Sequence, residues 1–217
     1  MHSTVGQLIV FEGGDGIGKS HLATLLTSHL AVVGLSVVQF SFPGRREGSL
    51  GNLIYSIHHS AKSLGVTEIT PIALQVLHIA AHLDEIISTI LPALESGLWV
   101  VLDRFWWSTW VYGVAAGADR RCLDLLIEAE KLAWSGVQPA AIFVVERDRA
   151  IREEHSQEAF ERLTSLYAEI RLREQVSQRI FTLNNNDMER CKAELLDLAD
   201  RITGSHVTKQ EDLQHDI

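Results

Sequence analysis

The feature that most constrains this chain is residues 13–20, Gly-Gly-Asp-Gly-Ile-Gly-Lys-Ser, which directly follow an apolar run at residues 7–11. The pattern G-x-x-x-x-G-K-[ST] between a strand and a helix is a phosphate-binding loop, because its backbone N–H groups and the helix N-terminus face one point. We expect Lys19 to reach the β- and γ-phosphates of a nucleoside triphosphate and Ser20 to hold a magnesium ion. A glycine-rich turn that binds nothing is the alternative, and the flanking strand and helix patterns favour the nucleotide site.

The length of 217 residues suits one α/β domain with a sizeable core. We expect residues 1–204 to form that domain, with a short lid around residues 147–158. Residues 205–217 are polar and lack periodicity, so we expect a disordered tail there. No internal repeat is visible.

The charge balance and the cysteines limit the possible partners and compartment. Nineteen Lys and Arg against twenty-eight Asp and Glu give a net charge of −9, which disfavours a nucleic-acid partner but allows a small anionic substrate held by a few arginines. Cys122 and Cys191 are the only cysteines, so no disulfide framework is available and a reducing cytoplasm fits best. The strand-like apolar runs are too short to cross a membrane, and we expect no membrane partner.

Short β-rich runs alternate with longer helical patterns, which predicts a parallel sheet with helices on both faces. The runs at residues 99–102 and 140–145 are apolar at consecutive positions, so these two strands should be central. The predicted strands are residues 7–11, 36–42, 99–102, 140–145 and 179–183. The predicted helices are residues 19–33, 49–63, 71–96, 119–135, a part of 149–176, and 187–203.

Two basic elements follow predicted strands. Arg45 lies in a glycine-rich loop after the second strand, where ligands of open α/β sheets bind, and it could reach an acceptor phosphate or remain a solvated loop charge. Asp103 and Arg104 end the third strand, where a magnesium-associated carboxylate and a phosphoryl-binding guanidinium would be placed. A surface ion pair is the alternative for these two residues.

A third basic element follows the fourth strand. Arg147, Arg149 and Arg152 could belong to a mobile segment that closes over the transferred phosphoryl group. They could equally mark a solvated helix start in which Glu153 and Glu154 pair with the arginines. The residue pattern leaves both interpretations open.

Together these motifs resemble the thymidylate kinase family of nucleoside monophosphate kinases over nearly the whole chain. The carriers are Phe-Glu-Gly-Gly-Asp-Gly-Ile-Gly-Lys-Ser at residues 11–20, Phe-Pro-Gly-Arg at 42–45, Asp-Arg-Phe at 103–105, and Tyr167. The resemblance implies a three-layer P-loop NTPase fold with a five-stranded parallel sheet, the substrates ATP and a nucleoside monophosphate, and Mg²⁺.

The resemblance also implies roles for individual residues. Asp15 would accept a hydrogen bond from the 3′-hydroxyl of the acceptor sugar, Arg45 and Arg104 would bind the acceptor phosphate, and Asp103 would orient magnesium-bound water. Because Ile17 occupies a loop position without an arginine, the stabilising arginine would come from the lid, where we favour Arg152. The predicted donor site comprises Gly13, Asp15, Gly16, Ile17, Gly18, Lys19, Ser20, His21, Arg147 and Asn185.

The acceptor pocket departs from the family pattern. His78 and His82 align with positions where the family carries an aromatic ring and an arginine, and Phe42, Trp107 and Tyr112 complete the predicted pocket. Imidazole stacks less well than phenyl and lacks the donor fork of guanidinium. These two positions therefore leave the identity of the acceptor open.

Three alternatives stay open for these side chains and for the function. The i, i+4 spacing of His78 and His82 would also suit a metal, although no third ligand is evident and a pocket wall is favoured. Trp106 and Trp110 share that spacing and could simply pack in the core. dTMP is the first acceptor to expect, but a different small acceptor, or a regulatory protein that has lost transfer, remains possible with so short a lid. The resemblance implies a homodimer formed through the helix after Pro71.

Overall fold

The computed structural model of the protein describes residues 6–149 and 156–204. Its centre is a five-stranded parallel sheet with the order β2-β3-β1-β4-β5. The strands are β1 (Leu8–Glu12), β2 (Val37–Ser41), β3 (Trp99–Asp103), β4 (Ala141–Glu146) and β5 (Ile180–Asn184). All five predicted strands are confirmed, and β3 and β4 flank the central β1, as their unbroken apolar runs predicted.

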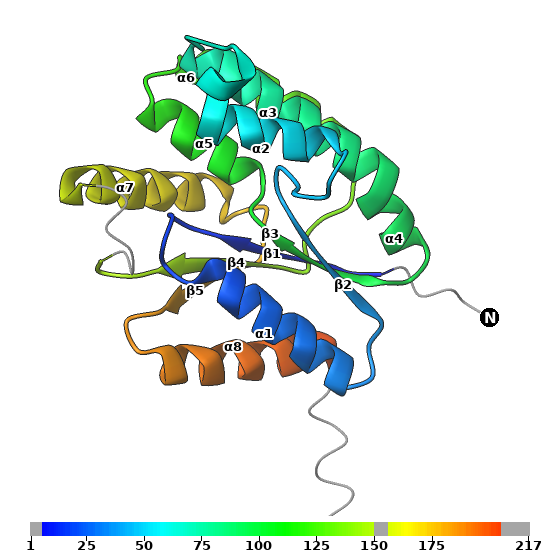
Figure 1. Cartoon of the computed structure of the whole chain (residues 1–217). Coiled ribbons are helices and arrows are strands. Elements are labelled where there is room, and N and C mark those ends of the chain that lie inside the picture. Colours follow the sequence, from blue (N-terminus) through cyan, green and yellow to red (C-terminus); the bar gives the residue numbers. More distant parts are fainter. Residues whose placement is uncertain (1–5, 150–155, 205–217) are drawn as a thin grey trace, which may run out of the picture.

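Helices cover both faces of the sheet, which confirms the predicted three-layer fold (Figure 1). On one face, α1 (Lys19–Val32) and α8 (Met188–Thr203) pack on the side chains of Ile9, Phe143 and neighbouring residues. The opposite face carries α2 (Leu50–Ser60), η1 (Ala61–Leu64), α3 (Pro71–Glu85), η2 (Ile86–Ile90), α4 (Leu91–Glu95), α5 (Trp106–Ala115), α6 (Arg120–Ala133) and α7 (Gln157–Glu174). The inner strands β1, β3 and β4 therefore bury both of their faces, whereas the edge strands β2 and β5 are only partly buried.

The predicted helix at residues 71–96 is continuous but not uniform. It begins at Pro71 after the N-cap Thr70, and one π-helical turn, Ile86–Ile90, separates α3 from α4. By length and apolar composition alone the stretch Pro71–Glu95 could cross a membrane, a weak indication because core helices pass the same test. Within this stretch Ile86, Ile90 and Leu94 are buried in the core cluster that covers one face of the sheet.

Helix α5 was missing from the sequence-based prediction. Its sequence, Trp-Trp-Ser-Thr-Trp-Val-Tyr-Gly-Val-Ala, is apolar almost all round, and its N-cap residue Phe105 makes no side-chain capping bond. Neither an amphipathic stripe nor a capping signal was therefore available. Helix α5 is instead buried between α3, α6 and α7. The predicted tail at 205–217 and residues 150–155 of the predicted lid lie outside the described residues.

Candidate active site

The loop after β1 has the shape that phosphate binding requires. Gly18, the N-cap of α1, has φ 97°, and a Cβ at that position would lie 2.4 Å from Nδ2 of Asn185. Only glycine meets both conditions, because side chains rarely adopt this backbone conformation. Lys19 is buried and its Nζ donates to the carbonyl of Gly14, so the ammonium group lies against the loop. Burial, assisted by Arg104, lowers the pKa of Lys19 to about 8.

Ser20 and Asp103 meet at the ends of α1 and β3. The Ser20 hydroxyl donates to Oδ2 of Asp103 over 2.5 Å, and Oδ1 of Asp103 is buried without a hydrogen-bond partner among the described residues. Hydroxyl and carboxylate oxygens are hard ligands of the kind that Mg²⁺ prefers. The unpartnered oxygen and the donor set therefore fit the predicted magnesium site.

Asp15, Arg104 and Tyr112 form the second charged group. The Arg104 guanidinium donates to Oδ1 of Asp15, and the Tyr112 hydroxyl donates to Oδ2 over 2.6 Å. Arg104 Cζ also lies 5.4 Å from the centre of the Tyr112 ring. Burial raises the pKa of Tyr112, so the phenol keeps its proton for the bond to Asp15. The structure thus brings together three of the predicted acceptor-site residues.

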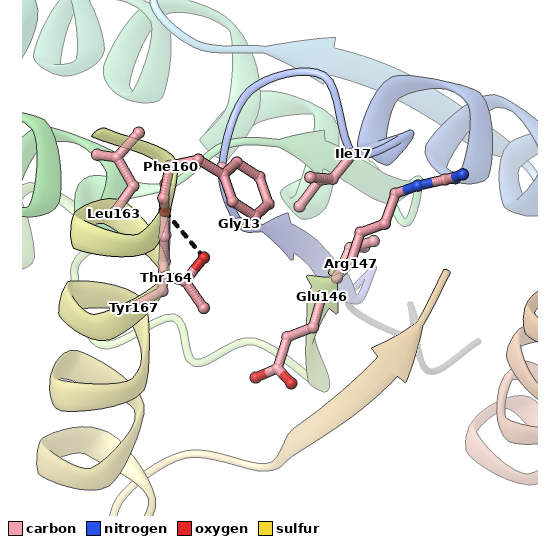
Figure 2. A pocket seen from close by; sticks show the side chains of 10 residues that line it. Gly13, Ile17, Glu146, Arg147, Phe160, Leu163, Thr164 and Tyr167 are labelled. Carbon is pink, nitrogen blue, oxygen red and sulfur yellow. Dashed lines mark hydrogen bonds between the residues drawn. The ribbon is translucent and has the colours of Figure 1, made fainter. Parts of the chain in front are cut away.

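Two open recesses border these groups. One, with a cavity volume of about 20 Å³, lies between the loop and α7, with Gly13, Ile17, Arg147 and Phe160 among its lining residues (Figure 2). The other, with a volume of about 380 Å³, lies between α5 and the start of α7 and includes Tyr112 and Arg162. Only the second recess has the size of a small-ligand site.

The predicted lid arginines are placed only in part. Arg147 donates from its guanidinium to the carbonyl of Asn185 over 2.9 Å, Arg149 is exposed, and Arg152 lies outside the described residues. The Asn185 side chain is fully buried, and its Nδ2 donates to the carbonyl of Ile17 over 2.6 Å. This side chain therefore supports the phosphate loop and is not placed to contact a donor base.

Histidines gather beside the acceptor-side residues. Nδ1 of His58 and Nε2 of His78 lie 2.9 Å apart, so one ring nitrogen donates to the other. Burial lowers the pKa of His78 to about 3, and the neighbouring His82 and His58 act in the same direction. His78 is consequently neutral at physiological pH. No group of three metal-ligating side chains occurs within residues 6–149 and 156–204, so the metal interpretation gains no support.

Three predicted substrate contacts need correction. His82 is buried, with its Nδ1 3.0 Å from Oε2 of the fully buried Glu130. The His82 ring stacks on Phe42 at 4.0 Å between centroids, which buries Phe42 as well. Trp107 has no exposed surface and packs in the core cluster. In this structure none of these rings presents a face to a ligand. Trp106 and Trp110 pack in the same core cluster, which favours the packing interpretation for those two tryptophans.

Arg45 and His21 are exposed. The Arg45 guanidinium lies 4.6 Å from the centre of the Tyr55 ring, on the loop between β2 and α2. No local sequence pattern assigns a supporting role to Glu12, Ser108 or Glu130, which bond to residues 48 or more positions away. The available signal was a charged residue, Glu12, ending an otherwise apolar strand.

A parallel sheet in the order β2-β3-β1-β4-β5, with a phosphate loop after β1 and an acid–arginine pair after β3, defines a P-loop NTPase fold. A family model described as Thymidylate kinase matches residues 11–195. The chain therefore belongs to the thymidylate kinase family, as the sequence resemblance implied.

Individual relatives agree with this assignment. The chain is 34% identical over 142 residues to "Thymidylate kinase" of Chlorobaculum parvum, a match covering 64% of this chain and 60% of that protein. It is 34% identical over 151 residues to "Thymidylate kinase" of Pelotomaculum thermopropionicum, covering 66% and 63%. The matched part thus spans less than two thirds of the length of these curated relatives. A crystal structure of thymidylate kinase from Ehrlichia chaffeensis superposes with a TM-score of 0.71 at 20% identity, covering 89% of this chain and 98% of that one, and shows the same fold.

Proposed function

We propose that this chain transfers the γ-phosphoryl group of ATP to a nucleoside monophosphate, with dTMP converted to dTDP. The observation that carries the proposal is the group of Asp15, Arg104 and Tyr112, held next to the phosphate loop at one edge of the sheet. A donor site and an acceptor site at that edge would place the two substrates for direct transfer. Membership of the thymidylate kinase family supports the same reaction.

On the donor side, the loop N–H groups and Lys19 would bind the ATP phosphates. Lys19 would leave its bond to Gly14 and turn to the phosphates, which would favour its charged form. Ser20 and Asp103 would hold Mg²⁺, which supplies charge neutralisation on the phosphates when bound. Arg147 is the described lid arginine that donates to the carbonyl of Asn185, whose side chain supports the phosphate loop. Arg152 remains our candidate for the transferred phosphoryl group.

On the acceptor side, Arg104 would bind the monophosphate and Asp15 would accept from the sugar hydroxyl. Arg45 would join Arg104 after leaving Tyr55. The neutral His78 would face the base without adding charge, and the recess beside Tyr112 offers space for the nucleoside. Catalysis would rest on positioning and electrostatic stabilisation, because phosphoryl transfer needs little covalent chemistry from the protein.

An ADP-release assay across the deoxynucleoside monophosphates tests the proposal. We expect dTMP to give the highest kcat/KM, and Arg45→Ala to raise the KM for dTMP. Arg46→Ala is the matched control, because Arg46 is exposed in the same loop but is not assigned to the site. Binding of ATP without turnover of any monophosphate would overturn the proposal, and turnover of a non-nucleotide that is indifferent to Arg45→Ala would assign a different acceptor.

We also propose a cytoplasmic homodimer with no nucleic-acid or membrane partner. The net charge of −9 and the two free cysteines support the compartment and the absence of a nucleic-acid partner. Exposed apolar side chains on the α3–η2 stretch, Val76 and Ile87, support pairing through the helix after Pro71. Light scattering after size exclusion would give the mass, and a monomer at micromolar concentration would contradict the dimer.

A further inference from the structure

Glu12 is a buried carboxylate without a role in the proposed reaction. It ends β1 and has no exposed surface. Its Oε1 accepts from the backbone N–H groups of Phe105 over 2.7 Å and Ser108 over 3.0 Å, and its Oε2 accepts from the Ser108 hydroxyl over 2.7 Å. Gly13 N and the Tyr167 hydroxyl lie 3.3 Å from Oε2. Every neighbour is a donor, so the group acts as a hydrogen-bond acceptor on both oxygens.

The first consequence is that Glu12, at the end of β1, caps helix α5. Helix α5 begins at Trp106, and its N-cap residue Phe105 offers no side-chain acceptor. The first N–H groups of a helix have no partner within it, and a negative charge there is favourable. Glu12 provides both the acceptor and the charge, although it lies 93 residues before Phe105.

The second consequence concerns the backbone of Arg104. Its φ of 76° is a left-handed conformation that non-glycine residues rarely adopt. The N–H of Arg104 donates to the carbonyl of Phe11 over 2.9 Å, and the next N–H, of Phe105, donates to Glu12. The end of β1 thus holds the backbone on both sides of the strained residue.

The third consequence concerns the Arg104 side chain. Its NH1 donates to the Ser108 hydroxyl over 3.0 Å, and that hydroxyl donates to Oε2 of Glu12. A hydroxyl has one proton and two lone pairs. The Ser108 hydroxyl can therefore accept from Arg104 and donate to Glu12 at the same time. A continuous chain of bonds therefore runs from Glu12 through Ser108 to the guanidinium that contacts Asp15.

We propose that Glu12 is a positioning residue that fixes both the backbone and the guanidinium of Arg104 for the acceptor phosphate. This inference rests on the proposed function, in which Arg104 binds the monophosphate. Glu12 acts through Arg104 and touches neither substrate.

The test is steady-state kinetics of Glu12→Gln with both substrates varied. The glutamine side chain has the same shape, but one acceptor oxygen is replaced by a donor NH₂ group. It therefore loses the hydrogen bond either to the α5 N–H groups or to the Ser108 hydroxyl. We expect kcat/KM for dTMP to fall by about 10- to 100-fold, while KM for ATP changes by less than about threefold. Glu174→Gln, at the end of α7, is the matched control for loss of a buried carboxylate and should change neither constant.

A double-mutant cycle separates positioning from a general loss of stability. In an Arg104→Lys background, Glu12→Gln should lower kcat/KM for dTMP by less than about threefold, because the group that it positions is gone. Losses that multiply independently, or an equal loss for ATP and dTMP, would overturn the inference. If Glu12→Gln does not fold, Ser108→Ala breaks the same chain, and Ser108→Thr should restore most of the activity.

Hydrogen exchange distinguishes this inference from the proposed function. Glu12→Gln should accelerate exchange of the Phe105 and Ser108 amides in the protein without substrates. A wild-type protein without activity toward any monophosphate would count against the function alone. Unchanged exchange at both amides, with unchanged kinetics, would count against Glu12 alone.

Discussion

Asp15 shows how a single residue organises the acceptor side of the site. Its two carboxylate oxygens receive the Arg104 guanidinium and the Tyr112 hydroxyl, which come from the β3–α5 connection and from α5. A charged acceptor binds such donors more strongly than a neutral one. The carboxylate thus holds an arginine and a phenol from a different segment beside the phosphate loop.

Asp15→Asn should weaken this arrangement with little change in size. The amide offers one acceptor oxygen and places a donor NH₂ group toward either Arg104 or Tyr112. We expect KM for dTMP to rise by at least about tenfold and the affinity for ATP to stay within about threefold. Calorimetric titration with each nucleotide would measure this, with Asp197→Asn on the surface of α8 as control. An equal loss for both nucleotides would contradict the separation.

His78 allows a prediction about acid stability. Its pKa is about 3 in the folded protein and near 6.5 when the chain is unfolded, so the unfolded state binds more protons between these values. Stability should therefore be complete above pH 6.5 and fall as the pH drops toward 3, by up to about 1.4 kcal/mol per pH unit. Urea unfolding at pH 5 to 7 should show a smaller slope for His78→Gln. His59→Gln changes an exposed neighbouring histidine and leaves the half-buried His78 ring in place, so it serves as the control. Equal slopes in the wild-type and His78→Gln proteins would refute the assignment.

The sequence could predict the residues that follow strand ends but not their distant partners. Lys19, Ser20, Asp103 and Arg104 were predictable because parallel strands present their carboxyl ends at one edge. His82 is held in the protein interior by its hydrogen bond to Glu130, which lies 48 residues later on α6. No local pattern joins the two residues, so the pocket could not be derived from spacing alone.

At the scale of elements, α5 connects the site to the core. It carries Ser108 and Tyr112 toward Arg104 and Asp15, while Trp106, Trp107 and Trp110 pack in the core. Its start is set by Glu12 instead of a local cap. The position of α5 therefore depends on packing and on a distant carboxylate. Neither leaves a local sequence pattern, so this helix was not predicted.

Trp107 tests whether the tryptophans of α5 are core residues or pocket residues. Trp107→Ala should cost about 3–5 kcal/mol of unfolding free energy, because it removes a fully buried ring. Trp107→Phe should cost less, since Nε1 of Trp107 has no hydrogen-bond partner among the described residues. Chemical denaturation would give these values, with KM for dTMP unchanged in the folded variants. A large rise in the KM for dTMP with little loss of stability would indicate that the Trp107 ring lines the acceptor pocket.

At the scale of the whole molecule, the proposed donor and acceptor sites draw on different parts of one sheet. The donor side uses the loop from β1 to α1 and its support from Asn185 after β5. The acceptor side uses α3 and α5 and the segment that joins β3 to α5. Strand alternation predicted the sheet edge that both sites share, and the family resemblance implied the division between donor and acceptor residues. The predicted lid is described only at residues 147–149 and 156–158.

The division predicts that each nucleotide stabilises the protein independently. ATP with magnesium, or dTMP alone, at about 100 times its Kd should add about 2.7 kcal/mol and raise Tm by roughly 5–10 °C. Lys19→Ala should abolish the shift with ATP but keep that with dTMP, because Lys19 lies on the phosphate loop. Asp15→Asn should keep the shift with ATP and, for a tenfold weaker Kd, roughly halve the shift with dTMP at the same concentration. Thermal scans of the four combinations would measure these shifts. If either substitution removed both shifts, the two sites would depend on each other through a shared element, and the β1–α1 loop that contains both residues would be that element.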